Sequence, residues 1–427
     1  MILTMRSRSY ALHAFSISLA LSLTACGAKT GLPVPDASLG DASVEVPDVP
    51  CIEVAFEAEP VNLDLRTEAA VGRADVAFLI DTTASMGDEI ARVRGQLRDR
   101  IVPAIRSEIP DSRLAVATFA DYPIGVFGTA GVDMPFRLML PATEDVNQVQ
   151  AAMNSIRLGD GRDEPESQVE ALYQLVTGAG IEGLVDPSAG CPAGGVGFAC
   201  FRRDAFPVVL LFTDAPFHNG PRGSDAYTFD TPVTHTYEEA VAELNALGAR
   251  VISFDSSARG DEASDQMAQI SRDTQAVDEN GDALVFSIGI RGDGLGVGVV
   301  DAIRRFAGSA VFDVDTVLLD VDRGDSVDAS SLVDSVLPGR AIPEGGVEGR
   351  DESRGAFLGV RAGTLLEFRV VLRNDVIAPG AVPRRYRIEV VFRADARNRI
   401  GSQIIEVVVP SIDGLGCGDA QRPSTAS

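Results

Sequence analysis

The chain has 427 residues, of which 62 are acidic and 37 are lysine or arginine, so its formal net charge is −25. This excess of negative charge argues against nucleic-acid binding, because little positive charge remains to neutralise phosphates, and it favours the binding of cations. The length predicts two domains after allowance for a leader and a tether.

Residues 1–25 have the layout of a secretory signal, with two early arginines and then an apolar stretch too short to span a bilayer as a stable helix. The stretch ends in Leu-Thr-Ala-Cys, which resembles the bacterial lipobox, where cleavage precedes a cysteine that is then lipidated. An ordinary signal peptide is the alternative. The resemblance implies a lipidated Cys26 as the protein's contact with the membrane. Gly27 is not the aspartate that retains lipoproteins at the inner membrane in Gram-negative sorting, so we expect an exported outer-membrane lipoprotein on the periplasmic or surface face.

The remaining four cysteines are an even number, which fits disulfides in an exported protein. Cys191 and Cys200 bracket a glycine-rich loop, and we expect them to pair locally. Cys51 and Cys417 then remain, one at each end of the folded region, and their pairing would bring those ends together. Metal-binding cysteines more often come as close CxxC pairs, which this sequence lacks.

Residues 26–50 are rich in Pro, Asp, Ala, Ser and Val without a lasting period, which predicts a flexible tether. Within residues 51–73, Ile52, Val54 and Phe56 alternate with other residues, including two glutamates, and this pattern predicts a half-buried strand. We expect that strand to pair with a β-domain at the other end of the sequence.

Residues 74–312 alternate strand and helix patterns. The run 75–80 is nearly continuously apolar, as in a parallel strand covered on both faces. Pro103 is expected to bend a helix that the apolar spacing predicts over 90–109. Further strands are predicted at 114–119, 136–140, 207–213, 251–254 and 284–288, and further helices around 146–156, 169–176, 236–248, 267–270 and 299–306. This alternation predicts a doubly wound, mostly parallel α/β sheet with helices on both faces.

Beyond residue 312 the hydrophobic period becomes two, as in Leu366, Phe368 and Val370. This pattern predicts an antiparallel β-domain over 313–417, most simply a sandwich, followed by a disordered tail over 418–427. If the strand within 51–73 belongs to that domain, the α/β domain is inserted into it.

The segment Asp81-Thr82-Thr83-Ala84-Ser85 stands at the carboxyl end of the first buried strand, where open parallel sheets place their ligand crevice. One carboxylate and two hydroxyls at alternate positions of a tight loop can face one small, hard cation, for which Mg²⁺ is the natural choice. Because hydroxyls are neutral, the ion would keep much of its charge and attract an external carboxylate.

Asp81, Thr83 and Ser85 match the DxSxS-type signature of the metal-ion-dependent adhesion site in von Willebrand factor A domains, and the chain resembles that family here. The segment Phe-Thr-Asp-Ala-Pro at 212–216 is a second point of resemblance, and it implies that Asp214 contributes to the same site. The resemblance implies Mg²⁺ or Mn²⁺ as the ion and a Rossmann-like fold. The alternative is that these residues only form turns and cap helices.

Asp163-Glu164-Pro165-Glu166 resembles the Asp-x-Pro-Glu loop found in the A-type domain of the integrin β family, which implies that Glu166 reaches the same ion. Asp121 matches an integrin residue that holds an adjacent Ca²⁺, so a second site would use Asp121, Asp163, Pro165 and Glu166. Gly161 stands where the integrins have an asparagine ligand, which is a departure from that second site.

Asp88 and Glu89 match the acidic pair of a third neighbouring site. The alternative is that both carboxylates only interact with the dipole of the helix that begins there. His218 follows the Asp214 strand and could border the metal, but one histidine does not make a zinc centre.

The sequence carries no GxSxG, P-loop or HExxH motif, and we expect a protein that is not an enzyme. We expect a lipoprotein that binds an unidentified protein or glycan partner by coordinating its exposed carboxylate to the ion. The alternative is a cell-envelope scaffold in which the metal only stabilises the fold. Because residues 218–235 follow a strand, they should line the metal face, and the Cys191–Cys200 loop should lie away from it.

Overall fold

The computed structural model describes residues 51–257, 262–322 and 327–418. The predicted signal, the lipidated Cys26, the tether over 26–50 and the tail beyond Gly418 lie outside these residues. Within them, no helix combines the length and the apolar character that a membrane crossing requires.

The α/β part is built on a six-stranded sheet with the order β5-β4-β3-β6-β7-β8. Its neighbouring strands are parallel except for β5, which runs antiparallel to β4. The expectation of a mixed α/β fold with parallel strands is therefore confirmed. Its strands are β3 (Arg73–Asp81), β4 (Asp111–Phe119), β5 (Arg137–Thr143), β6 (Phe206–Thr213), β7 (Arg250–Asp255) and β8 (Val285–Ser287).

The strand order reverses between β3 and β6. From β3 the polypeptide adds β4 and β5 on one side, then returns to add β6, β7 and β8 on the other. This is the doubly wound order 3-2-1-4-5-6, in which the crevice outside the carboxyl ends of the strands at the reversal takes the ligand. Asp81 ends β3 and Asp214 directly follows β6, so the topology brings both residues to that crevice.

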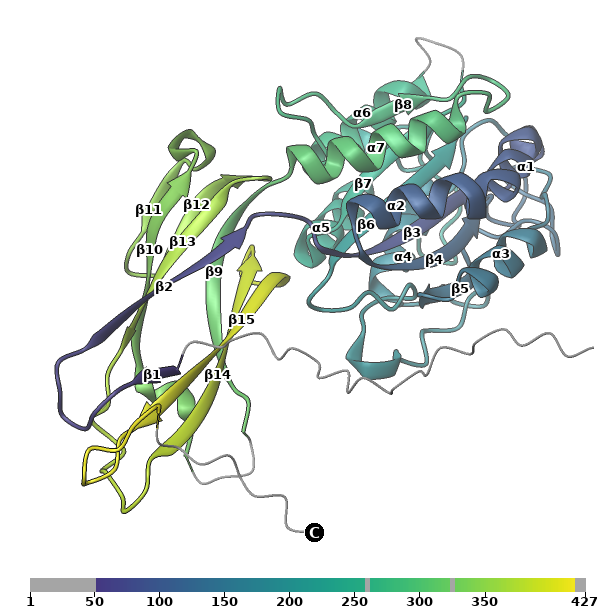
Figure 1. Cartoon of the computed structure of the whole chain (residues 1–427). Coiled ribbons are helices and arrows are strands. Elements are labelled where there is room, and N and C mark those ends of the chain that lie inside the picture. Colours follow the sequence, from purple (N-terminus) through teal and green to yellow (C-terminus); the bar gives the residue numbers. More distant parts are fainter. Residues whose placement is uncertain (1–50, 258–261, 323–326, 419–427) are drawn as a thin grey trace, which may run out of the picture. The chain divides into compact units, whose positions relative to one another are not determined.

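Both faces of this sheet are buried. Val76, Phe78 and Ile80 of β3 belong to one hydrophobic cluster, whereas Ala77 and Leu79 belong to the other, as the alternation of strand side chains requires. Helices α1, α2, α3 and α7 contribute to the first cluster and α4, α5 and α6 to the second, and Figure 1 shows α1, α2 and α7 together on one face. The helices are α1 (Gly87–Gln96), α2 (Val102–Glu108), α3 (Val146–Ser155), α4 (Gln168–Thr177), α5 (Tyr237–Leu247), α6 (Glu262–Asp273) and α7 (Leu295–Ser309). Short 3₁₀ helices are η1 (Ala84–Met86), η3 (Pro192–Gly194), η4 (Pro221–Gly223), η5 (Ala329–Leu332) and η6 (Glu344–Gly346).

The long helix expected over 90–109 is interrupted by a π-helical turn, η2 (Leu97–Ile101), between α1 and α2. The N–H of Val102 bonds to the carbonyl of Leu97, five residues earlier. Pro103 follows immediately and has no N–H to donate to the preceding turn. The irregularity therefore lies before the proline, because the widened turn adapts the helix to the missing donor.

Two further sheets are formed mainly by the C-terminal part, in the orders β1-β15-β14-β9-β12-β11 and β10-β13-β2. Phe368 of β13 contacts Phe357 of β12 and Phe392 of β14, with ring centroids 5.0 and 5.4 Å apart, so the two sheets share a core. The strands are β1 (Cys51–Glu53), β2 (Val61–Glu68), β9 (Val311–Asp320), β10 (Val333–Ile342), β11 (Gly349–Asp351), β12 (Ala356–Arg361), β13 (Leu365–Leu372), β14 (Arg384–Ala394) and β15 (Asn398–Val409).

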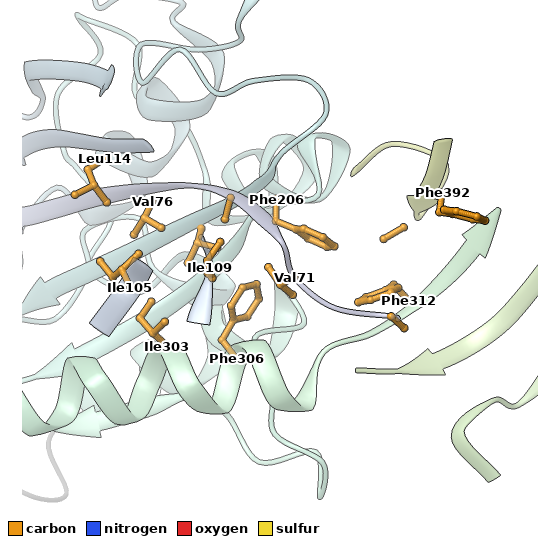
Figure 2. Packing of buried hydrophobic residues seen from close by; sticks show 14 of the residues in the cluster. Val71, Val76, Ile105, Ile109, Leu114, Phe206, Ile303, Phe306, Phe312 and Phe392 are labelled. Atoms are coloured by element: carbon orange, nitrogen blue, oxygen red, sulfur yellow. The ribbon is translucent and has the colours of Figure 1, made fainter. Parts of the chain in front are cut away.

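The segment before the α/β part forms two strands, where one was expected. β1 is shorter than predicted and pairs in parallel with β15, and β2 pairs antiparallel with β13. β2 was not predicted, although its sequence, Val-Asn-Leu-Asp-Leu-Arg-Thr-Glu, alternates apolar and polar residues and buries Leu65 and Thr67. Buried hydrophobic residues continue from the α/β part into β9, where Phe206 and Phe312 lie 5.7 Å apart (Figure 2).

Both expected disulfides, Cys191–Cys200 and Cys51–Cys417, are present. The second joins β1 to the segment after β15 and spans 366 residues of sequence. Two disulfides indicate an extracytoplasmic protein, because thiols stay reduced in the cytosol.

Candidate metal centre

The predicted metal residues of the β3 loop come together with Asp214. Asp81 is fully buried, and its Oδ1 accepts hydrogen bonds from the N–H and Oγ1 of Thr83 at 2.9 and 2.7 Å. Thr83 Oγ1 lies 3.3 Å from Ser85 Oγ, which donates to Asp214 Oδ1 at 3.1 Å. Thr213 Oγ1 donates to the other oxygen of Asp81 at 2.8 Å. Two carboxylates and two hydroxyls thus form one oxygen cluster at the carboxyl ends of β3 and β6.

Glu166 completes this cluster from the loop before α4. Its backbone is held by Pro216, whose carbonyl accepts from the N–H of Glu166 at 2.9 Å. The side chain is 3 % exposed, and Oε2 has no hydrogen-bond partner among the described residues. Thr83, Ser85, Asp214 and Glu166 line one open cavity of about 320 Å³. The donors are all oxygens, as Mg²⁺ requires, and a solvent path reaches them.

The negative charge of the clustered carboxylates favours a bound cation. Burial, followed by the charge of Asp214, raises the pKa of Asp81 to about 7. Burial, followed by the charges of Asp81 and Asp121, raises the pKa of Glu166 to about 11. Within the described residues, Asp81, Glu166 and Asp214 form no ion pair with a basic side chain. Buried carboxylates are normally paired or bound to a metal, so this cluster fits a divalent ion.

At the opposite end of the sheet, the acidic side chains are paired with arginine. There, Arg202 pairs with Asp75 and Asp111 at 2.8 and 2.7 Å, and Arg73 pairs with Asp111 at 2.7 Å and with Asp204. At that end of the sheet, arginine side chains therefore neutralise the acidic groups. The described residues place no such arginine at the carboxyl ends of β3 and β6, which distinguishes that end as the candidate site.

The residues expected at a second site also come together in part. Asp121 is fully buried at the end of β4, and burial raises its pKa. Asp163 and Asp121 meet at Nε2 of His218, which lies 3.1 and 3.4 Å from their respective Oδ2 atoms. Pro165 lies half-buried in the loop between Asp163 and Glu166. His218 belongs to this group, although in the sequence it stands as a lone histidine without the spacing of a zinc site.

Sequence reasoning missed Tyr227, whose hydroxyl donates to Oδ1 of Asp121. Its ring also packs against Phe127, at 5.1 Å between centroids, and against His218, at 4.2 Å. Residues 218–235 therefore reach the metal end of the sheet. A signal was present, since this loop follows the Asp214 strand, but nothing in the sequence pairs Tyr227 or His218 with residues about a hundred positions earlier.

Asp88 and Glu89, expected at a third site, lie in different environments. Asp88 is exposed, whereas Glu89 is 2 % exposed and its Oε2 has no hydrogen-bond partner among the described residues. Burial raises the pKa of Glu89, and the charge of Asp214 adds to that rise. Arg92 opposes the rise, but its guanidinium also pairs with Asp293 and donates to the carbonyl of Arg291 at 2.6 Å.

The Cys191–Cys200 loop lies at the other end of α4 from Glu166. The N–H of Ala199 bonds to the carbonyl of Leu175, in the last turn of that helix, at 3.3 Å. This position is away from the oxygen cluster, which the first turn of α4 approaches.

Neither a protein-family model nor a curated protein matches the chain. Among solved structures, it is similar to a von Willebrand factor type A protein from Catenulispora acidiphila, at 13% identity and a TM-score of 0.35, over 84% of this chain and 72% of that one. It is also similar to proximal thread matrix protein 1 from the mussel byssus, at 13% identity and a TM-score of 0.31, over 56% of this chain and 47% of that one.

Proposed function

We propose that the chain is a cell-envelope protein whose A-type domain binds a protein or glycan partner through a divalent cation. Asp81, Thr83, Ser85, Asp214 and Glu166 would hold Mg²⁺ or Mn²⁺, and no catalytic step is involved. The observation that supports the proposal is the cluster of buried carboxylates, unpaired with arginine among the described residues, at the point where the strand order reverses.

The donor set also supports a role in binding. Two of the five side chains are neutral hydroxyls, which add no negative charge to that of the three carboxylates. Ser85 is exposed, and the cavity of about 320 Å³ opens beside it. When bound, the ion would supply an electrophilic site for a partner's carboxylate. The protein's own residues would hold the ion and exclude competing ligands from its buried side.

The β-sheets support a carrier role in the envelope. The Cys51–Cys417 disulfide ties β1 to the segment after β15, and the α/β part lies between β2 and β9 of this covalently closed unit. We propose that this unit is a β-sandwich and that a lipid on Cys26 anchors it to the outer membrane.

Thermal unfolding with and without Mg²⁺ tests the metal. A ligand at one hundred times its Kd stabilises the folded state by about 2.7 kcal/mol, and Asp81→Ala should abolish that gain. Asp328→Ala is the matched control, because Asp328 accepts from the N–H and Oγ of Ser330 at 3.0 and 2.6 Å in a similar turn before η5. The control should lose stability but keep the Mg²⁺ response. A metal response that is unchanged in Asp81→Ala would sink the assignment.

Partner capture separates binding from scaffolding. The immobilised protein should retain a partner from an envelope extract in Mg²⁺, release it to a chelator, and fail to retain it as Asp81→Ala. If the metal stabilises the protein but capture is insensitive to chelator and to the variant, the scaffold alternative holds instead.

A further inference from the structure

His218 has a fixed orientation beside the oxygen cluster. The residue is 3 % exposed, and Nδ1 lies 2.5 Å from the backbone carbonyl of Asp225. A carbonyl oxygen only accepts hydrogen bonds, so the hydrogen of the neutral ring must be on Nδ1. Nε2 is then the atom with a free lone pair, and it faces two carboxylates. A histidine that ligates a metal commonly has this arrangement, donating its other N–H to a carbonyl.

Three segments of the polypeptide meet at this nitrogen. Asp121 comes from the end of β4, Asp163 from the loop before α4, and His218 from the loop after β6. One ligand atom from each lies within 4.8 Å of the others, and Nε2 is 3.1 Å from Asp163 Oδ2 and 3.4 Å from Asp121 Oδ2. Ligands bound at about 2.0–2.2 Å from one ion are about 2.8–3.6 Å from each other at octahedral to tetrahedral angles. The two contacts to Nε2 have that spacing.

Unsatisfied oxygens point to a missing ligand here. Oδ2 of Asp121, which faces Nε2, has no hydrogen-bond partner among the described residues, and Asp121 is fully buried. Oδ1 of Asp163 is also buried without a partner in that part of the chain. An imidazole lone pair directed at carboxylate oxygens is repulsive unless a cation lies between them. Buried polar atoms in native proteins rarely stay unpaired, so this group requires a partner.

We propose that Asp121, Asp163 and His218 form a second metal site that takes a transition-metal ion, such as Zn²⁺ or Mn²⁺, in preference to Ca²⁺. Imidazole nitrogen suits zinc, copper, iron and nickel, whereas Ca²⁺ takes oxygen ligands almost exclusively. This donor set differs from the all-oxygen Ca²⁺ site that the integrin resemblance implies. The site is separate from the one at Asp81, and neither requires the other.

The metal would join the loops of the binding face. Tyr227 and His218 belong to the loop 218–235, and Tyr227 donates to Asp121 from the same side. Asn219, next to His218, bonds through its side chain to Thr234 Oγ1 and to the carbonyl of His235, both at 2.9 Å. A metal on His218 would thus hold both ends of this loop against β4 and the Asp163 loop. The expected effect is an ordered partner-facing surface.

Electron paramagnetic resonance of bound Mn²⁺ tests the site in the full-length protein after removal of metals by a chelator. Mn²⁺ fits both proposed sites, and the pulsed measurement detects a nitrogen atom bonded directly to the ion. The unaltered protein should bind two Mn²⁺ ions, one of them with nitrogen coupling that persists in excess Ca²⁺. His218→Gln should bind one ion without nitrogen coupling. Asp81→Ala should also bind one, but with the coupling retained.

His235→Gln is the matched control, because His235 is the other described histidine and pairs with Glu170 at 3.0 Å. It should keep both ions and the nitrogen coupling. If His218→Gln melts well below the unaltered protein, the measurement uses Asp163→Asn instead, because the Asp163 side chain is 30 % exposed. Asp163→Asn should also lose the nitrogen-coupled ion.

Three results would overturn the proposal. Equal Mn²⁺ stoichiometry in the unaltered protein and in His218→Gln would mean that no ion uses this nitrogen, and that a proton on His218 is the cation of the cluster. Loss of the nitrogen coupling in His235→Gln would also overturn the proposal, and so would complete displacement of the coupled ion by Ca²⁺. If Asp81→Ala leaves two ions bound and the coupling intact, the proposed function fails while the His218 site stands.

Discussion

Replacing Arg202 by methionine should expose the energetic cost of an unpaired carboxylate in this fold. Asp75 is fully buried, and Arg202 bonds to it through its backbone N–H at 2.5 Å and its Nε at 2.8 Å. Burial raises the pKa of Asp75 even with the arginine in place. Removing one partner of a buried pair costs about 3–5 kcal/mol.

Protonation of Asp75 limits this cost. Protonating a carboxyl group at pH 7 from its ordinary pKa of 3.8 costs about 4 kcal/mol, at 1.36 kcal/mol per pKa unit. The backbone N–H of residue 202 still donates in the variant, so we expect a loss of about 3–4 kcal/mol. Because the folded-state pKa of Asp75 is raised, the folded variant binds more protons than the unfolded one. The loss should therefore grow as the pH rises from about 4 and shrink as it falls.

Urea unfolding of the Mg²⁺-loaded protein measures the effect as a shift in midpoint at constant slope. The double variant Asp75→Asn with Arg202→Met removes both charges, and it should recover at least half of the loss, because an amide is far less costly to bury than a carboxylate. A single variant within about 0.5 kcal/mol of the parent, the usual effect of a surface change, would refute the reasoning. So would a double variant as unstable as the single one.

Two further predictions concern the metal loop and the β-sheets. Gly161 has φ +58°, and an added Cβ would lie 2.6 Å from Glu166 Oε1. Because this contact would displace a metal ligand, Gly161→Ala should weaken Mg²⁺ binding about tenfold, or about 1.4 kcal/mol. Calorimetric titration measures the change in affinity. Gly125→Ala is the control, because it has the same backbone strain, at φ +60°, but its added Cβ would meet no atom within 4 Å, and it should keep the Mg²⁺ affinity. Equal Mg²⁺ affinities in the two variants would contradict a clash with Glu166. The hydrogen bond and charge of Arg340, with some opposition from burial, lower the pKa of Glu367 to about 2. The stabilisation is thus complete above the ordinary value of 4.5 and lost as the pH falls toward 2, so Glu367→Gln should lower the melting temperature near neutral pH but not near pH 2. An equal difference at every pH would argue against this pair.

The local sequence determined the β3 strand and its metal loop. Its short, nearly continuous apolar run predicts an inner strand. Asp81, Thr83 and Ser85 lie within five residues of one another at its end, so their proximity needs no tertiary information. Asp214 is similar, because it follows a second apolar strand and the ends of parallel strands meet at one edge. The disulfides were predictable because Cys191 and Cys200 bracket one short loop, which left Cys51 and Cys417 as the second pair.

Tertiary structure alone decided the rest. His218 could not be joined to Asp121 and Asp163 from the sequence, because the three residues come from separate loops and meet only when the sheet is assembled. Pairing between the strand within 51–73 and the C-terminal β-domain was expected from the sequence. The particular partners, β15 for β1 and β13 for β2, depend on contacts roughly three hundred residues or more apart, which no local pattern encodes. The charge balance of the two sheet ends is also a property of the fold. Nearness in space, and not the number of acidic residues, determines which carboxylates have an arginine and which need a metal ion.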